Sequence, residues 1–281
     1  MRIAITGATG FVGRFLTEAA LRAGHEVTVL GRQPGLFSAP VAHLAYDLRQ
    51  KPPPLDGHDA LIHAAFLHEP GRYRGGEGDD PAGFRAANLD GTLRLFEAAQ
   101  GCERVLFLSS RAVYGDHPPG TLLTEATPLR PDTLYGELKA EAEAALEALP
   151  VASASLRATG VYGPAGPGRA HKWTALFEKF RAGAPIAPRV ATEVHGDDLA
   201  AAALLLLEAP AESIGGAWNV SDLLLDQRDL LAEVVCVAGG PELPARADAA
   251  LVNVMDCSRL RSLGWRPGGW DRLRKAIPGL I

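Results

Sequence analysis

The sequence predicts an α/β fold built on a doubly wound parallel sheet, with a smaller C-terminal domain. Short apolar runs alternate with helix-length amphipathic stretches through the first two-thirds of the 281-residue chain. A glycine-rich turn also separates the first apolar run from the first amphipathic stretch. Strands that alternate with helices pair in parallel through right-handed crossovers, which gives a sheet with helices on both faces.

The expected elements follow from this periodicity. Strands are predicted near 2–6, 26–30, 42–46, 60–63, 105–109 and 153–157, and helices near 11–23, 84–100, 134–149, 171–181 and 197–208. Gly24, Gly101 and Pro150 mark three of the helix ends. Residues 69–83 are rich in Gly, Pro, Asp and Arg without periodicity, so a loop is expected there. Residues 222–281 predict short helices and a closing turn at Leu263-Gly264-Trp265.

Composition excludes several classes of protein. The net charge of −5 provides no basic field for nucleic acid or an anionic membrane. The longest apolar run, 199–207, is too short to cross a bilayer, and no targeting signal is recognised, so we expect a cytoplasmic protein. Cys102, Cys236 and Cys257 lack metal or disulfide spacing and are interpreted as small core residues in a reducing compartment, and no metal is predicted.

The turn Gly7-Ala8-Thr9-Gly10-Phe11-Val12-Gly13 follows the first strand and opens the first helix. Glycines at these points allow a tight turn, a close approach to a pyrophosphate, and close packing of helix on strand. The helix N-terminus adds free N–H groups and the positive end of its dipole. We therefore predict that 1–160 form a Rossmann-type NAD(P)-binding domain to which 190–221 return. Residues 161–281 form the smaller substrate-binding region.

The end of the second strand carries Gly31-Arg32 where an NAD site usually places a carboxylate on the ribose. A guanidinium binds a 2′-phosphate that a carboxylate would repel, so NADP is favoured over NAD. The alternative is that Arg32 stacks on the adenine or is solvated. Asp47 and Leu48, past the third strand, are candidates for the adenine amino group, although Asp47 alone is also typical of a strand-end cap.

Tyr135 and Lys139 stand four residues apart, on one face of a predicted helix. A free tyrosine has a pKa of about 10, and a neighbouring ammonium favours its phenolate, which makes it usable as a base. Ser109 and Ser110 end an apolar strand at the edge where open parallel sheets bind ligands. A hydroxyl there can donate to a substrate carbonyl. The alternatives are a surface i,i+4 pair and a serine that caps a helix.

These motifs together resemble the extended short-chain dehydrogenase/reductases, the NAD-dependent epimerase/dehydratase family. Further matching segments are Ile62-His63-Ala64-Ala65, Asn88-x-x-Gly91-Thr92, Val113-Tyr114-Gly115, Tyr162-Gly163-Pro164, Val194-His195-x-Asp197-Asp198 and Leu263-Gly264-Trp265-x-Pro267. The resemblance implies that Ser110 polarises the substrate oxygen, Tyr135 is the general acid/base and Lys139 binds the nicotinamide ribose. It also implies a supporting role for Asn88, and a homodimer through the helices near 84–100 and 134–149.

The cofactor residues expected from the motif and the resemblance are Gly7, Thr9, Gly10, Phe11, Val12, Gly13, Arg32, Asp47, Leu48, Ala64, Ala65, Ser109, Tyr135, Lys139 and Thr159.

Departures from the family pattern concern the substrate. Arg111-Ala112 stand where dehydratases carry an acidic pair, so elimination of water is not expected. Gly160 replaces an asparagine that helps hold a nucleotide sugar, and Ala191-Thr192-Glu193 lack the usual diphosphate-binding arginine, whose nearest candidate is Arg189. Further basic groups on segments that line the cleft in similar proteins are Arg72, Arg74, Arg111, Arg169, His171 and Lys172. They are compatible with an acidic or phosphorylated small substrate, and the alternative, favoured for any single one of them, is a solvated loop charge. We take Arg111, Gly160, Lys172 and Arg189 as candidate substrate residues.

The leading hypothesis is an NAD(P)-dependent oxidoreductase that interconverts a carbonyl and an alcohol on a small sugar-like substrate. A nucleotide-sugar epimerase with a retained NAD is the first alternative. The second is a non-catalytic NADP-binding sensor, which would have no need of the Ser110, Tyr135 and Lys139 set.

Overall fold

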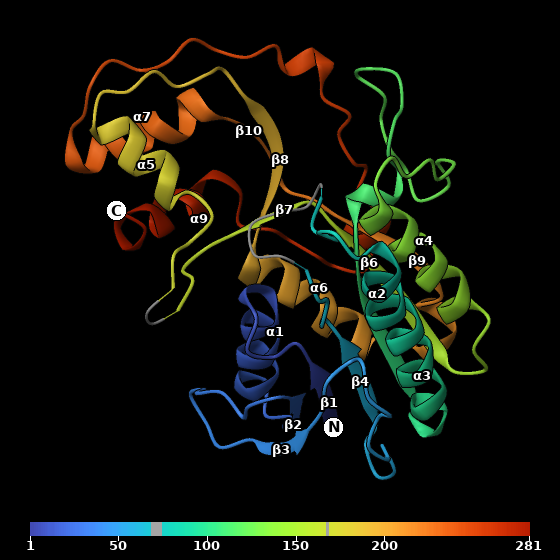
Figure 1. Cartoon of the computed structure of the whole chain (residues 1–281). Helices are drawn as coiled ribbons and strands as arrows, with labels where there is room; N and C mark the ends of the chain where they lie inside the picture. The colour runs from blue at the N-terminus through green and yellow to red at the C-terminus, as the bar shows by residue number, and fades with distance from the viewer. Residues whose placement is uncertain (69–74, 167–168) are drawn as a thin grey trace.

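The computed structural model describes residues 1–68, 75–166 and 169–281 of the chain. Arg72, Arg74 and the first part of the predicted 69–83 loop lie outside these residues. The described chain forms a layered main part and a smaller part that holds the C-terminus (Figure 1).

The main part is built on one parallel sheet, which confirms the predicted doubly wound fold. Its seven strands lie in the order β3-β2-β1-β4-β5-β6-β9, and every neighbouring pair is parallel. The strands are β1 (Arg2–Thr6), β2 (Glu26–Gly31), β3 (Ala42–Ala45), β4 (Ala60–His63), β5 (Arg104–Ser110), β6 (Ala152–Ala158) and β9 (Gly216–Val220). The strand order reverses beside β1, so the end of β1 lies at the crevice where such sheets bind ligands.

Helices cover both faces of this sheet. On one face α1 (Phe11–Arg22) packs against α6 (Gly196–Glu208), over the apolar side chains of Ile3, Ile5 and Val29. The other face carries α2 (Pro81–Arg85), α3 (Gly91–Ala98) and α4 (Leu134–Glu147), as Figure 1 shows. The helix predicted over 84–100 is one helical segment in which a π-helical turn, Ala86–Asp90, joins α2 to α3 and a 3₁₀ turn, Ala99–Gly101, ends it.

The smaller part has a three-stranded sheet of its own. β7 (Gly160–Tyr162) lies parallel to β8 (Val190–His195), and β8 lies antiparallel to β10 (Leu223–Asp226). The helices α5 (Thr174–Arg181), α7 (Gln227–Ala238) and α9 (Gly269–Ala276) pack around a core that includes Tyr162, Trp173 and Phe177. Of the segment 190–221, α6 and β9 join the main layer, whereas β8 belongs to this small sheet.

The remaining elements are short. They are the 3₁₀ turns Arg111–Val113, Ala211–Ser213, Ala249–Leu251 and Ile277–Gly279, and the helix α8 (Ser258–Ser262). The closing turn predicted at Leu263-Gly264-Trp265 is formed: Gly264 has a φ of 97°, and the buried Trp265 donates its indole N–H to the Asp198 carbonyl at 2.8 Å. The C-terminal segment is thereby fixed to α6.

One prediction about the cysteines is wrong. Cys102 and Cys257 are buried as expected, but Cys236 is exposed on α7. It lies on the side of an amphipathic helix that faces solvent, which the local sequence does not distinguish from its buried face. Across the described ranges, no helix is both long enough and apolar enough to span a membrane.

Candidate active site

The glycine-rich turn is shaped by contacts that exclude side chains. Gly7 has a φ of 68°, and a Cβ there would lie 2.6 Å from the Ala65 nitrogen. A Cβ on Gly13 would lie 2.0 Å from the Gly7 carbonyl oxygen. The turn therefore requires glycine both for its left-handed backbone and for the close packing of α1 on β1.

A buried hydrogen-bond chain fixes the end of β4 beside this turn. His63 Nδ1 lies 2.6 Å from the Thr6 hydroxyl and its Nε2 lies 2.8 Å from the Thr92 hydroxyl. The Ala64 and Ala65 amides each donate to the same Thr6 oxygen at 3.2 Å. Burial, together with the nearby charge of Lys139, lowers the pKa of His63 to about 3, so the imidazole is a neutral connector of β1, β4 and α3.

Asn88 secures the segment that follows. Its side-chain oxygen accepts from the Leu67 amide and its NH₂ donates to the Leu67 carbonyl, both at 2.7 Å, and it also donates to the Phe84 carbonyl at 3.0 Å. Asn88 sits in the π-helical turn, and such turns are frequent at functional sites. The geometry is that of a supporting residue.

The residues at this edge fit a dinucleotide. α1 begins at Phe11 and Val12 behind Gly10, which offers no side-chain cap, so the first amide groups of the helix face the turn. The Thr159 hydroxyl is buried and has no partner among the described residues. Both features provide donors that a phosphate or a carboxamide could use. Arg169 donates to the Thr9 carbonyl at 2.6 Å, which places a guanidinium against the turn.

The adenosine end of the predicted site is more exposed to solvent than the glycine turn. Arg32 is exposed just after β2. Asp47 accepts from the Arg49 amide at 3.0 Å, as a strand-end cap does, with 18% of its side chain exposed. Leu48 is buried in the core, and its carbonyl accepts from Arg94 at 3.0 Å. The adenine contact of Asp47 and Leu48 stays a prediction.

The three predicted catalytic residues lie on adjacent elements. Ser110 ends β5, and its hydroxyl accepts from the Ala112 amide at 3.1 Å as the cap of a 3₁₀ turn. Tyr135 stands in the first turn of α4, with the Phe66 ring edge-on at 4.9 Å between centroids. Lys139 follows one turn later, and its Nζ lies 5.9 Å from the centroid of the Tyr135 ring.

Lys139 is a buried cation at this edge. It is 3% exposed and donates to the Leu108 carbonyl at 2.6 Å. Its ammonium also lies 4.4 Å from the centroid of the Phe107 ring. Burial lowers the pKa of Lys139 to about 7, although Glu143 opposes that shift. An ammonium held this close to a phenol favours the phenolate.

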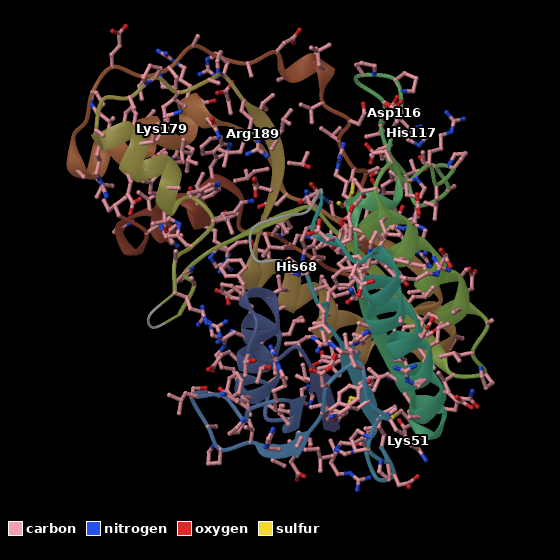
Figure 2. The ribbon with its side chains drawn as sticks, viewed as in Figure 1. Lys51, His68, Asp116, His117, Lys179 and Arg189 are labelled. Carbon is pink, nitrogen blue, oxygen red and sulfur yellow. The ribbon has the colours of Figure 1, made fainter. Side chains whose placement is uncertain are left out.

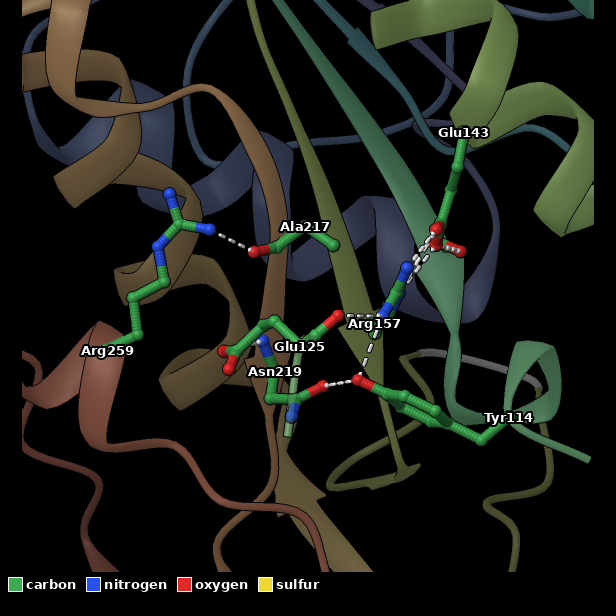
Figure 3. A network of polar contacts seen from close by, with 8 residues as sticks. Tyr114, Glu125, Glu143, Arg157, Ala217, Asn219 and Arg259 are labelled. Carbon is green, nitrogen blue, oxygen red and sulfur yellow. Dashed lines mark hydrogen bonds and ion pairs between the residues drawn. The ribbon is translucent and has the colours of Figure 1, made fainter. Parts of the chain in front are cut away.

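A polar network behind these residues could not be read from the sequence (Figure 3). Glu143, one turn beyond Lys139, forms a buried ion pair with Arg157 of β6 at 2.6 Å. Ser109 donates its hydroxyl to the same carboxylate, so any cofactor contact of Ser109 falls to its backbone. Arg157 also donates to the Tyr114 hydroxyl at 3.0 Å, and Tyr114 donates to Asn219 of β9 at 2.6 Å.

The structure brings two of the four candidate substrate residues together. Gly160 lies beside Lys172, and Lys172 is paired with Glu193, which the sequence marks only as part of a segment that lacks the diphosphate-binding arginine. Arg189 is exposed just before β8, as Figure 2 shows, and its charge acts on both members of that pair. Arg111 lies apart: it donates to the Asn253 carbonyl at 2.9 Å and joins the 3₁₀ turn to the C-terminal segment.

His195 is a packed residue at the edge of the site. Its Nδ1 accepts from the Asp197 amide at the start of α6, and its ring lies edge-on to Phe15 and Tyr162. Burial lowers the pKa of His195 to about 4. No group of metal-ligating side chains occurs within the part of the chain that the structure describes.

A parallel nucleotide-type sheet with a glycine turn and a Ser–Tyr–Lys set defines the class of the extended short-chain dehydrogenase/reductases. The family model of the NAD dependent epimerase/dehydratase family matches residues 3–221. The chain belongs to this family, which confirms the resemblance seen in the sequence.

The named relatives include both a dehydrogenase and an epimerase. The dTDP-6-deoxy-L-talose 4-dehydrogenase (NAD(P)(+)) of Kitasatospora kifunensis is 33% identical over 185 residues, 59% of this chain and 54% of that protein. UDP-glucose 4-epimerase 4 of Oryza sativa subsp. japonica is 33% identical over 158 residues, 50% of this chain and 42% of that protein. The matched segments span about half the length of these relatives.

A solved structure extends the likeness over the full chain. The UDP-glucose 4-epimerase of Thermus thermophilus, in complex with NAD, superposes with a TM-score of 0.78 at 28% identity. The superposition covers 100% of this chain and 99% of that one. The main sheet and the small C-terminal part are therefore both shared.

Proposed function

We propose that this protein is an NAD(P)-dependent oxidoreductase that interconverts a carbonyl and an alcohol on a small sugar-like substrate. The observation that carries the proposal is the placement of Tyr135 over the buried ammonium of Lys139, beside the strand end that presents Ser110. That arrangement supplies a proton donor and acceptor at a sheet edge suited to a dinucleotide.

The chain's own residues handle the proton and the oxygen. When bound, the nicotinamide supplies or accepts the hydride. Tyr135 gives its proton to the substrate oxygen in reduction, or takes it in oxidation. Ser110 donates a hydrogen bond to that oxygen, and the charge of Lys139 stabilises the phenolate form of Tyr135. The glycine turn lets α1 begin close against β1, and the first amide groups of α1 would donate to the pyrophosphate there.

The epimerase alternative is supported by the similarity of the chain to UDP-glucose 4-epimerases, among them those of Oryza sativa and Thermus thermophilus. An epimerase re-reduces its own intermediate and therefore retains its dinucleotide, whereas a reductase exchanges it at each turnover. The sensor alternative is supported by no specific contact, because it leaves the Tyr135–Lys139 arrangement without a use.

Release of bound nucleotide separates these possibilities. We expect the purified protein, once denatured, to yield little or no NAD(H), and the native protein to oxidise added NADPH with a neutral sugar or lactone. Chromatography of the released nucleotide and the loss of NADPH absorbance are the measurements. Stoichiometric tightly bound NAD with no net turnover would instead support the epimerase, and free exchange without turnover on any carbonyl would support the sensor.

NADP is proposed as the preferred cofactor because Arg32 is exposed at the end of β2. Arg32→Asp should weaken NADPH binding by roughly 10-fold to 100-fold, since a hydrogen bond to a charged group contributes about 1.5–3 kcal/mol. NADH binding should be unchanged or stronger. Dissociation constants from nicotinamide fluorescence measure this, with Lys51→Asp as a control of equal charge change on an exposed residue. Equal losses for both nucleotides would refute the assignment.

We also propose a homodimer through the α2–α3 segment and α4, which lie together on one side of the main sheet (Figure 1). Their outer surface carries the 37% exposed Leu93 and the Arg85–Glu141 ion pair. Sedimentation of the wild type and of Leu93→Glu tests this, because a monomer in both cases contradicts it.

A cytoplasmic location is also part of the proposal and is testable by cell fractionation.

A further inference from the structure

An ion pair occupies the space that a side chain at residue 160 would need. Lys172 donates its Nζ hydrogen to Glu193 Oε2, and Gly160 is the register partner of Glu193 across β7 and β8. A Cβ on Gly160 would lie 2.6 Å from Oε2 and 2.7 Å from Nζ. Gly160 has a φ outside the left-handed region, so any residue could adopt its backbone conformation. Glycine is needed there because a side chain would collide with the ion pair.

The pair lies close to the proposed chemistry. Ala158 at the end of β6 is the register partner of Ser110 at the end of β5. The chain then passes through Thr159, a proposed cofactor residue, and enters β7 at Gly160. Gly160 is thus two residues beyond the level of Ser110, on the strand that leads from the main sheet into the small one.

Because the pair is buried, the charged form of Lys172 and the charged form of Glu193 each stabilise the other. The Glu193 side chain is 4% exposed and that of Lys172 is 28% exposed. Burial raises the pKa of Glu193 and lowers the pKa of Lys172, and each group opposes the shift of the other. Trp173, next in the chain to Lys172, stacks on Tyr162 with centroids 5.0 Å apart and anchors the lysine backbone. The member of the pair that a ligand can reach is therefore the Lys172 ammonium, and its charge is already balanced by the Glu193 carboxylate.

We propose that the Lys172–Glu193 pair sets the specificity of this site, selecting a polyhydroxylated carbonyl compound that carries no phosphate. This inference rests on the proposed function. Lys172 donates to a substrate oxygen, while Glu193 holds that ammonium and repels a phosphate brought near it. Without the carboxylate, Lys172 and the neighbouring Arg189 would form an uncompensated cationic site that favours a diphosphate.

Anion binding tests this without any need for turnover. Inorganic pyrophosphate is titrated calorimetrically into protein saturated with NADP, so that the cofactor's own phosphate site is filled. Glu193→Gln should bind pyrophosphate at least about tenfold more tightly than the wild type. Glu193→Gln/Lys172→Met should lose that gain. Glu242→Gln, an exposed glutamate of the same part of the chain, is the control and should behave as the wild type.

A second variant disturbs the pair while keeping both of its charges. Gly160→Ala places a methyl group against both members of the pair, so it should separate them and also raise the pyrophosphate affinity. Retained NADP affinity shows that each variant is folded. Unchanged pyrophosphate affinity in both Glu193→Gln and Gly160→Ala would overturn the inference, as would tight binding by the wild type. Failure of every neutral sugar as a substrate would instead count against the proposed function.

Discussion

Tyr135→Phe is expected to lower kcat by about 100-fold to 10,000-fold, the range that a positioned general acid or base contributes. The substitution removes only the hydroxyl and keeps the ring that packs edge-on against Phe66. Nucleotide binding should therefore be retained. Steady-state consumption of NADPH, together with a fluorescence titration of the nucleotide, measures the two effects separately.

Tyr46→Phe is the matched control. The Tyr46 hydroxyl is buried and has no partner among the described residues, and burial raises its pKa to about 12. Its removal takes away a buried polar group that makes no hydrogen bond, so neither activity nor stability should fall. If Tyr135→Phe turned over as fast as Tyr46→Phe, Tyr135 would not be the acid/base.

Glu143→Gln is expected to lower the free energy of unfolding by about 3–5 kcal/mol, because it leaves Arg157 buried without its counter-charge. Both side chains of the pair are less than one-tenth exposed, at 8% and 7%. The change also weakens the acceptor of the Ser109 hydroxyl. Urea denaturation followed by circular dichroism gives the loss.

Glu141→Gln provides the comparison on the same helix. Glu141 pairs with Arg85 at the surface of the single chain, with 44% and 45% of the side chains exposed, so in a protein diluted until it is monomeric the pair contributes about 0–1 kcal/mol. Glu143→Leu/Arg157→Met should recover much of the stability, since replacement of a whole buried pair by apolar groups is often neutral. Equal losses for Glu141→Gln and Glu143→Gln would show that burial of the pair is not what matters.

The parts of the fold that the sequence predicts well depend on local patterns. The glycine turn, its strand and the start of its helix occupy consecutive positions, and Tyr135 and Lys139 are one helical turn apart. Local spacing also explains why the strands from β1 to β6 lie where the sequence predicts them. The sequence does not predict β7, β8, β9 and β10. After residue 160 short apolar runs no longer alternate regularly with helix-length stretches, and these strands are held by partners distant in the sequence.

The partners of charged groups depend on tertiary structure, which is why the sequence does not reveal them. The sequence alone suggests that Glu143 is one more exposed glutamate of an amphipathic helix. In the fold, β6 places Arg157 against it. The sequence alone places Glu193 in an incomplete phosphate site. The structure places Lys172 and Gly160 beside it. In the sequence Gly160 stands out only for an absent asparagine, and the structure supplies the reason that a side chain is excluded there.

The central claim is that Ser110, Tyr135 and Lys139 surround the reacting end of the cofactor. A crystal structure of the protein with NADP tests it most directly. The account predicts the pyrophosphate on the turn from Gly7 to Gly13, and the nicotinamide ribose within hydrogen-bond reach of Tyr135 and Lys139. A nicotinamide that lay away from Tyr135, with Lys139 still bound only to the Leu108 carbonyl, would contradict the account.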